Sequence, residues 1–384
     1  MRQTLRTTRG FTLVELMVSM GVGLVLMGSA LLLYVQATKA TFTTSERSEM
    51  QQDFRAASNI LQRDISMAGA GSLGQQGLAA YSIGLPTGAG SIVPVYPCST
   101  TTCNYANNVA VAYPTVAGAP YLFSIIPGNN LGITVNATEG PTDIITVAYA
   151  DARLPLNCYA ADVISSTQVL FELPINLAAN SCVLPPGLAN PPGLMDAGVG
   201  LQQGDLILFG QTAVGVVSNV GAGGVTNPAL YSTAFTVNFN AGDVGNINQP
   251  AVVVGSMKQL ALGTGLSAVR LQVITYYLDI SPIDGVTPRL MRIQSGRAPA
   301  PVAENVAFLK FSYDVDNNGI ITPNLATLPA GVTPNMITKV NILHMSIRSQ
   351  LNGVGGYQGL DLQTSICARN LTMGQEYPLS GTGY

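Results

Sequence analysis

The stretch that decides the fold is GFTLVELMVSMGVGLVLMGSALLLYVQAT, which runs from Gly10 to Thr38. Glu15 is its one charged residue, and the 23 residues that follow, Leu16 to Thr38, are uncharged. As an α-helix with a rise of about 1.5 Å per residue, those residues extend about 35 Å, which is enough to cross a bilayer with some tilt. The stretch therefore predicts a membrane-spanning helix.

The ten residues before this helix are basic. They include Arg2, Arg6 and Arg9 and no acid, so the positive-inside rule predicts that they stay in the cytoplasm. A secretory signal peptide fits less well, because its apolar core has roughly 7 to 15 residues and its small cleavage-site residue follows that core. Here the small residue Gly10 precedes the apolar run. A plain signal anchor stays as the simpler alternative.

The junction GFTLVE, from Gly10 to Glu15, resembles the processing site of type IV prepilins and of type II secretion pseudopilins. The resemblance implies that a prepilin peptidase cuts after Gly10 and that the new amine of Phe11 is methylated. It also implies that Glu15 neutralises the Phe11 amine of a neighbouring subunit during filament assembly. An acid near the end of a membrane helix costs a few kcal/mol unless it is paired or reaches the interface. The simpler alternative is that Glu15 only reaches the interface.

The helical pattern continues beyond the apolar run. Apolar residues recur at spacings of three and four, as on one face of a helix, at Met50, Phe54, Ala57, Leu61, Ile65 and Ala68. Charged residues are expected off this face, at Arg47, Glu49, Asp53, Arg55, Arg63 and Asp64. Gly69-Ala70-Gly71 then supplies a stop signal. The sequence thus predicts one helix of about 55 residues whose second half packs on a globular head.

The rest of the chain predicts β structure. Gly and Pro number 41 and 23 among 384 residues, which favours turns between short strands. Apolar or alternating runs are expected to form strands at residues 109–113, 143–150, 168–173, 204–210, 214–220, 234–239, 269–280, 304–315 and 337–350. The charges are 17 basic against 20 acidic, which argues against nucleic-acid binding by bulk charge. The predicted fold class is α+β, with a long N-terminal helix packed on a β-rich head.

The order of motifs in the C-terminal half gives a second resemblance. GDLILF, a short strand pair, VITYYL, PRLMRI, ENVAFLKFSYDVDNNG and a final IRSQL strand are similar to the PilW family of minor pilins, with pseudopilin J of type II secretion as a close relative. The resemblance covers residues 10–71 and 204–350, and residues 72–200 resemble no family that we can name. The expected division is a leader (1–10), a transmembrane and filament-core helix (11–38), an amphipathic half-helix (39–70), a loop-rich β insertion (71–203) and a β-rich pilin head (204–384).

One segment, DVDNNG from Asp314, carries a metal-binding pattern. It fits the start of a calcium loop, in which side-chain oxygens of Asp314, Asp316 and Asn318 and the carbonyl of Ile320 point at one ion. An EF-hand has a glutamate at the twelfth loop position, where this chain has Leu325. The alternative is that the Asn-Gly pair forms the tight turn of a β-hairpin. The PilW resemblance favours calcium, because relatives often show a similar acidic segment here.

Five cysteines fit an oxidising compartment. Local bridges Cys98–Cys103 and Cys158–Cys182 are plausible, but the sequence does not fix the connectivity. Cys367 is expected either as a buried free thiol or as a replacement for one of those partners.

No catalytic motif stands out. The one histidine, His344, lies in an apolar strand pattern, and the chain has no G-x-S-x-G, P-loop or H-E-x-x-H sequence. The sequence therefore predicts a non-enzymatic protein, with calcium as its one candidate cofactor.

By resemblance, the expected function is that of a minor pilin, incorporated near the tip of a type IV pilus to promote its assembly. The expected partners are prepilin peptidase, the major pilin, other minor pilins, a tip adhesin and, before assembly, inner-membrane lipid. The head would face the periplasm and later lie in the extracellular pilus. Nucleic acid is not expected, because residues 72–200 hold a single basic residue, Arg153. Two alternatives stay open: a J-type pseudopilin of type II secretion, and an adhesive or binding module displayed on the pilus.

Overall fold

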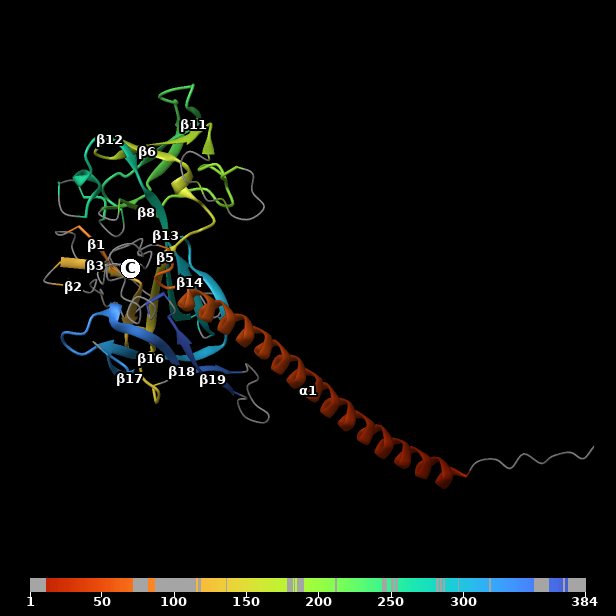
Figure 1. Cartoon of the computed structure of the whole chain (residues 1–384). Helices are drawn as coiled ribbons and strands as arrows, with labels where there is room; N and C mark the ends of the chain where they lie inside the picture. Colours follow the sequence, from red (N-terminus) through yellow and green to blue (C-terminus); the bar gives the residue numbers. More distant parts are fainter. Residues whose placement is uncertain are drawn as a thin grey trace, which may run out of the picture.

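The computed structural model describes residues 12–71, 82–86, 115–116, 119–135, 137–177, 182, 184, 190–210, 213–243, 247–249, 252, 255–280, 283, 285, 287–295, 297–317, 319–348, 359–368 and 370–371. One long helix extends from a β-rich head, and its first half stands clear of the head (Figure 1). The α+β fold class predicted from the sequence is confirmed.

Helix α1 spans Leu13–Ser66, which is 54 residues. Thr12 caps its N-terminus and Met67 its C-terminus. Gly69 and Gly71 follow with φ angles of 76° and 63°, a left-handed conformation that glycine adopts without steric cost. The predicted length and stop signal of the helix are therefore confirmed.

The two halves of α1 differ in their surroundings. The large apolar side chains between Leu13 and Val35 are exposed in the monomer. In the second half, Ala57, Leu61 and Ile65 have no exposed surface and belong to the main hydrophobic core. The predicted apolar face is thus confirmed from Met50 onward, while the helix between residues 36 and 49 is mostly exposed.

The largest sheet runs in the order β15-β14-β13-β5-β4, with β8 and β9 attached through β13. Its strands are β4 (Ile125–Gly128), β5 (Ile144–Ala150), β8 (Leu206–Phe209), β9 (Ala213–Val216), β13 (Ala268–Ile280), β14 (Pro288–Gln294) and β15 (Ala300–Glu304). Strand β13 is buried on both faces over most of its length, which explains its nearly unbroken apolar run.

A four-stranded antiparallel sheet, β17-β16-β18-β19, forms the opposite end of the head from β6, β11 and β12 (Figure 1). Its strands are β16 (Val306–Asn317), β17 (Ile320–Leu325), β18 (Ile337–Arg348) and β19 (Gly359–Cys367). Helix α1 contacts β15 and β19, which are edge strands of the two sheets. Its buried face therefore covers two sheet edges that would otherwise be open to other chains.

A five-stranded sheet, β10-β11-β7-β6-β12, has a hydrophobic core of its own. Its strands are β6 (Ala160–Ser165), β7 (Gln168–Pro174), β10 (Asn219–Gly223), β11 (Tyr231–Asn238) and β12 (Gly263–Leu266). The rings of Phe209 and Phe239 meet edge to face in this core, with centroids 5.5 Å apart. Short strands β1 (Ser82–Gly84), β2 (Thr115–Val116) and β3 (Ala119–Phe123) form a further sheet, and the 3-10 helices are η1 (Leu156–Cys158), η3 (Met257–Gln259) and η4 (Pro334–Met336).

Most predicted strand runs coincide with strands, and one was wrong. The run 214–220 divides into the end of β9 and the start of β10. The chain leaves the first sheet there, because Val217 donates its N–H to Asp205 and Ser218 donates its N–H to Asn238 in β11. The run 109–113 lies outside the described residues. Strands from residues 71–203 and from residues 204–384 share sheets, as in the β5–β13 and β7–β11 pairs.

Candidate functional site

The N-terminal half of α1 exposes a continuous row of large apolar side chains. Helix α1 is long and apolar enough to cross a membrane, with a mean hydropathy of 2.2 over its most apolar window, and that window has no buried surface in the monomer. Large apolar side chains such as Leu24, Val25 and Tyr34 are about 70% exposed. Such a surface needs lipid or other protein around it, so its partner is outside the folded monomer.

A hydrogen-bonded pair, Thr12 and Glu15, forms the N-terminal end of this surface. The backbone N–H and the hydroxyl of Thr12 both donate to Glu15 Oε2 over 3.0 Å, and the Glu15 N–H donates back to the Thr12 hydroxyl over 3.3 Å. This is a capping box, which satisfies free N–H groups at the start of a helix. The carboxylate of Glu15 is thereby held over the helix end. Gly10 and Phe11 lie outside the described residues.

The N-terminal segment matches a known family. Residues 5–31 match the model described as the prokaryotic N-terminal methylation motif. The matched segment is a prepilin-type motif, and it includes Gly10 and Glu15. The motif indicates a pilin or pseudopilin that prepilin peptidase processes and that assembles with other pilins, and with the apolar helix it supports membrane anchoring. Comparison with curated proteins and with solved structures gave no match.

The other end of the helix is fixed to the head through Asp64. Its carboxylate is fully buried and accepts hydrogen bonds from the hydroxyl of Tyr276 over 2.6 Å, from Arg292 Nε over 2.9 Å and from the hydroxyl of Tyr149 over 3.3 Å. These partners come from β13, β14 and β5. One side chain of the helix is therefore tied to three neighbouring strands of the largest sheet.

The surroundings of Asp64 favour protonated tyrosines. Burial, and then the negative charge of Asp64, raise the pKa of Tyr149 to about 12. The same causes raise the pKa of Tyr276 further. Burial would lower the pKa of Arg292, but the nearby Tyr276 and Asp64 raise it above its ordinary value. At neutral pH both hydroxyls therefore stay protonated and act as donors, and the guanidinium is charged.

The sequence prediction placed Asp64 off the buried face of the helix, and this was wrong. Asp64 follows Leu61 by three residues and precedes Ala68 by four, so it lies on the same face as both. The signal was therefore present in the spacing. A lone acid is normally found at the surface, and the strand residues that bind Asp64 inside the head are more than 80 residues away along the chain.

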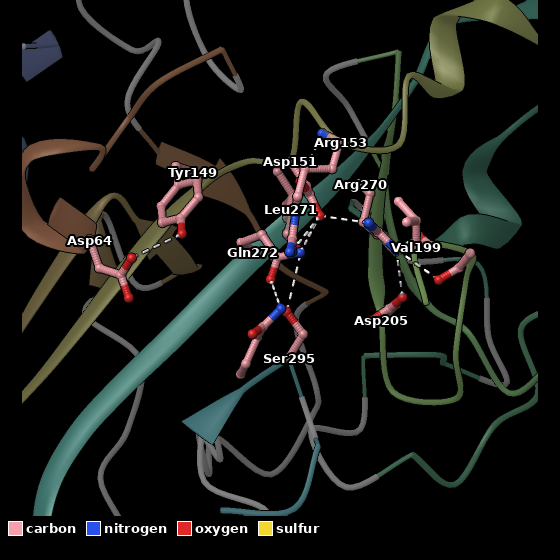
Figure 2. Close-up of polar contacts among 12 residues, drawn as sticks. Asp64, Tyr149, Asp151, Arg153, Val199, Asp205, Arg270, Leu271, Gln272 and Ser295 are labelled. Atoms are coloured by element: carbon pink, nitrogen blue, oxygen red, sulfur yellow. Dashed lines mark hydrogen bonds and ion pairs between the residues drawn. The ribbon is translucent and has the colours of Figure 1, made fainter. Parts of the chain in front are cut away.

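A second buried polar cluster surrounds Arg270 in β13 (Figure 2). Its guanidinium is 1% exposed and donates to Asp151 Oδ2 over 2.6 Å, to Asp205 Oδ2 over 3.4 Å and to the carbonyls of Val199 and Gly200 over 2.8 and 2.9 Å. Arg270 therefore attaches the segment before β8 to the centre of the largest sheet. The sequence offered no signal for this cluster beyond a charge inside an apolar run.

The two carboxylates around Arg270 respond in opposite directions. Burial alone would raise the pKa of Asp151, but the hydrogen bond from Arg153 and the charge of Arg270 bring it down to about 2. Burial raises the pKa of Asp205, and its hydrogen bond from Gln202 and its ion pairs do not offset this. Asp151 is thus the carboxylate that anchors the cluster in its charged form.

The predicted calcium segment lies in the hairpin of β16 and β17. Asn317 pairs with Ile320 across a two-residue turn, and Gly319 has a φ angle of 85°. Asn318 lies outside the described residues. The hairpin turn that the sequence left open as an alternative is therefore present.

Both predicted carboxylates accept hydrogen bonds within this sheet. Asp314 Oδ1 accepts from the backbone N–H of Asn324 over 2.9 Å and from the side-chain amide of Asn341 over 2.8 Å. Asp316 Oδ1 accepts from the N–H of Gly319 over 2.7 Å. Among the described residues, no three His, Cys, Asp or Glu side chains lie close enough to hold a metal ion. Calcium binding stays a prediction.

Within the described chain, two cysteines form a bridge and a third is exposed. Cys158 and Cys182 form a disulfide, as the sequence suggested. Cys367 is exposed at the end of β19, so the expectation that it is buried was wrong, and it does not replace a partner in the Cys158–Cys182 bridge. Cys98 and Cys103 lie outside the described residues. The backbone of His344 belongs to β18 and pairs with Lys310, and its side chain is also outside the described set.

Proposed function

We propose that this pilin-like protein is a minor pilin of a type IV pilus, held in the inner membrane with its head in the periplasm and then incorporated near the pilus tip, where it promotes assembly. The observation that carries the proposal is the exposed apolar half of α1, joined to the N-terminal methylation motif. A helix that leaves 23 uncharged residues uncovered is suited first to lipid and then to the helices of other pilins.

The head supports a role at a filament end. It contains a second core and a five-stranded sheet beyond the two sheets that hold α1. A large head is harder to pack along a filament than at its tip, where one side has no neighbour. The resemblance to minor pilins agrees with this placement, and the J-type pseudopilin is the alternative because both classes share the N-terminal motif.

The decisive experiment is a clean gene deletion scored separately for surface pili, twitching and secretion of exoproteins. The expected result is loss of pili and of twitching with normal secretion, restored by the wild-type gene. Normal pili with impaired secretion would instead show a pseudopilin. Normal pili and normal secretion with lost surface attachment would show a displayed binding module.

We also propose that the β16–β17 hairpin takes up calcium, with Asp314, Asp316, Asn318 and the Ile320 carbonyl as ligands. The two carboxylates of this set, Asp314 and Asp316, lie two residues apart in β16, which places them on the same face of the strand. Binding would compete with the hydrogen bonds that Asp314 and Asp316 accept, so weak affinity is expected. Calorimetry with millimolar calcium tests the idea, and absence of heat together with an unchanged melting temperature in chelator would dispose of it.

A further inference from the structure

Three polar side chains from separate segments meet beside strand β16. They are Asn130 in the turn after β4, Asp143 just before β5 and Lys310 in β16. Lys310 Nζ donates to Asp143 Oδ1 over 2.7 Å and also to Asn130 Oδ1. An amine, a carboxylate and a side-chain amide therefore share one point, although Asn130 and Lys310 are 180 residues apart in the sequence.

Backbone contacts hold the three groups in place. The N–H of Asp143 donates to the Leu309 carbonyl over 2.9 Å, and the N–H of Phe311 donates to Asp143 Oδ2 over 2.9 Å. The N–H of Asn130 donates to Asp143 Oδ1 over 2.8 Å. Asp143 is 1% exposed and the side chain of Lys310 is 18% exposed. The carboxylate is thus fixed between the other two groups and largely shielded from water.

This arrangement has the parts that an amide transfer needs. Asn130 Cγ is one bond from the oxygen that accepts from Lys310 Nζ, so the amine lies near the carbonyl carbon that it would attack. A lysine amine attacks a carbonyl only when it has lost a proton, and Asp143, in contact with the amine, is placed to take that proton. Holding the groups together in the fold replaces the encounter of two molecules with a step inside one molecule, which is worth a large effective concentration.

We propose that Lys310 and Asn130 become joined by an isopeptide bond that the folded chain forms by itself, with Asp143 as the acid–base group. The Lys310 ammonium gives a proton to Asp143, and neutral Nζ attacks Asn130 Cγ. The Cγ–Nζ bond forms and the Cγ–Nδ2 bond breaks as Asp143 passes the proton to Nδ2. Nitrogen leaves as ammonia, which takes the remaining proton and departs as ammonium. No oxidant or reductant takes part.

The bond would join the two sheets that hold the helix. Asn130 follows β4 in the largest sheet and Lys310 belongs to the four-stranded sheet. A covalent link at this point resists separation of the sheets under tension, which hydrogen bonds alone do poorly. This inference does not depend on the proposed place of the protein in a pilus.

Peptide mass spectrometry on the full chain, extracted in detergent, reduced and digested with trypsin, tests the bond. The expected product is one branched peptide that joins the segments holding Asn130 and Lys310, lighter than their sum by one ammonia, with no cleavage after Lys310. Two linear peptides of full mass in the wild-type protein would overturn the proposal, because they would show that Lys310 and Asp143 form only an ion pair.

The variants separate the chemistry from the packing. Lys310→Arg keeps the charge beside Asp143 but not the reactive amine, and Asn130→Ala removes the electrophile, so both should give linear peptides. Asp143→Asn should also give linear peptides, and a branched peptide in that variant would overturn the role of the carboxylate. Asn305→Ala is the matched control, since Asn305 has a positive φ angle of 60°, close to the 57° of Asn130, and is not one of the three residues of the cluster. It should keep the branched peptide.

Discussion

The two halves of α1 belong to one continuous helix, but their side chains have different surroundings. The second half buries Leu61 and Ile65 in the head and pairs Asp64 with three strands. The first half leaves its apolar side chains exposed, and its Glu15 carboxylate accepts hydrogen bonds from Thr12 at the end of the same helix. The side chains on the buried face of the second half are therefore covered when the head folds. The apolar side chains of the first half stay exposed in the monomer, so lipid or other subunits have to cover them.

The strongest test of this difference between the two halves removes the carboxylate of Glu15 from the exposed first half. Glu15→Val should leave membrane insertion, processing and folding of the head unchanged. Under the proposed function it should reduce incorporation into filaments at least about tenfold, because the Phe11 amine of a neighbouring subunit would then have no charged partner. The measurement is the ratio of protein in sheared pili to protein in membranes.

Glu49→Val is the matched control for this change. Glu49 is exposed in the same helix, between the apolar run and the head, so its loss should leave the ratio near the wild-type value. Normal incorporation of the Glu15 variant would show that the carboxylate only reaches the interface, as the simpler interpretation holds.

The next largest effect is expected at Asp64. Asp64→Ala leaves the guanidinium of Arg292 and the hydroxyl of Tyr276 without their buried acceptor, and breaking such a pair costs about 3–5 kcal/mol. The free energy of unfolding, from denaturant titration, should fall by that amount. Asp53→Ala, at a half-buried position of the same helix half, should change it by less than about 0.5 kcal/mol. Equal effects of the two variants would mean that Asp64 does not tie the helix to the head.

The sequence predicted the outline of both halves because each depends on local periodicity. The spacing of Ala57, Leu61 and Ile65 predicts a buried face, and the GFTLVE junction lies in the segment that matches the N-terminal methylation motif. Asp64 was misplaced because its charge outweighed its position on that face. The junction of Asp143 with Lys310 could not be predicted at all, since only the pairing of strands brings together residues 167 positions apart.

The strands show the same limit. The long apolar runs of β13 and β16 mark them as buried, but β6 and β19 alternate small or polar residues with apolar ones and were missed. Their burial depends on neighbours contributed by distant parts of the chain, which single-sequence patterns do not encode.

Acid should lower the stability of the folded head through protonation of Asp151. Its pKa is lowered to about 2 in the folded protein, against about 4 when unfolded, so its contribution is present above pH 4 and is lost as the pH falls towards 2. The free energy of unfolding should decline by on the order of 2 kcal/mol over that range from this residue alone. Denaturant titrations at several pH values measure the decline, and Asp151→Asn should flatten it. A slope identical in that variant and in the wild type would assign the acid sensitivity elsewhere.

The smallest effect on stability is expected when an apolar side chain in the exposed first half of α1 is shortened. This change tests the difference between the two halves most directly. Leu24→Ala removes a side chain that is 71% exposed in the monomer, so the free energy of unfolding of the head should change by less than about 0.5 kcal/mol. Leu61→Ala, the same substitution at a fully buried position, should lower it by about 2–5 kcal/mol. If Leu24→Ala also destabilised the head, the first half would contact it in the monomer, and the claim that the surface is covered only from outside would be wrong.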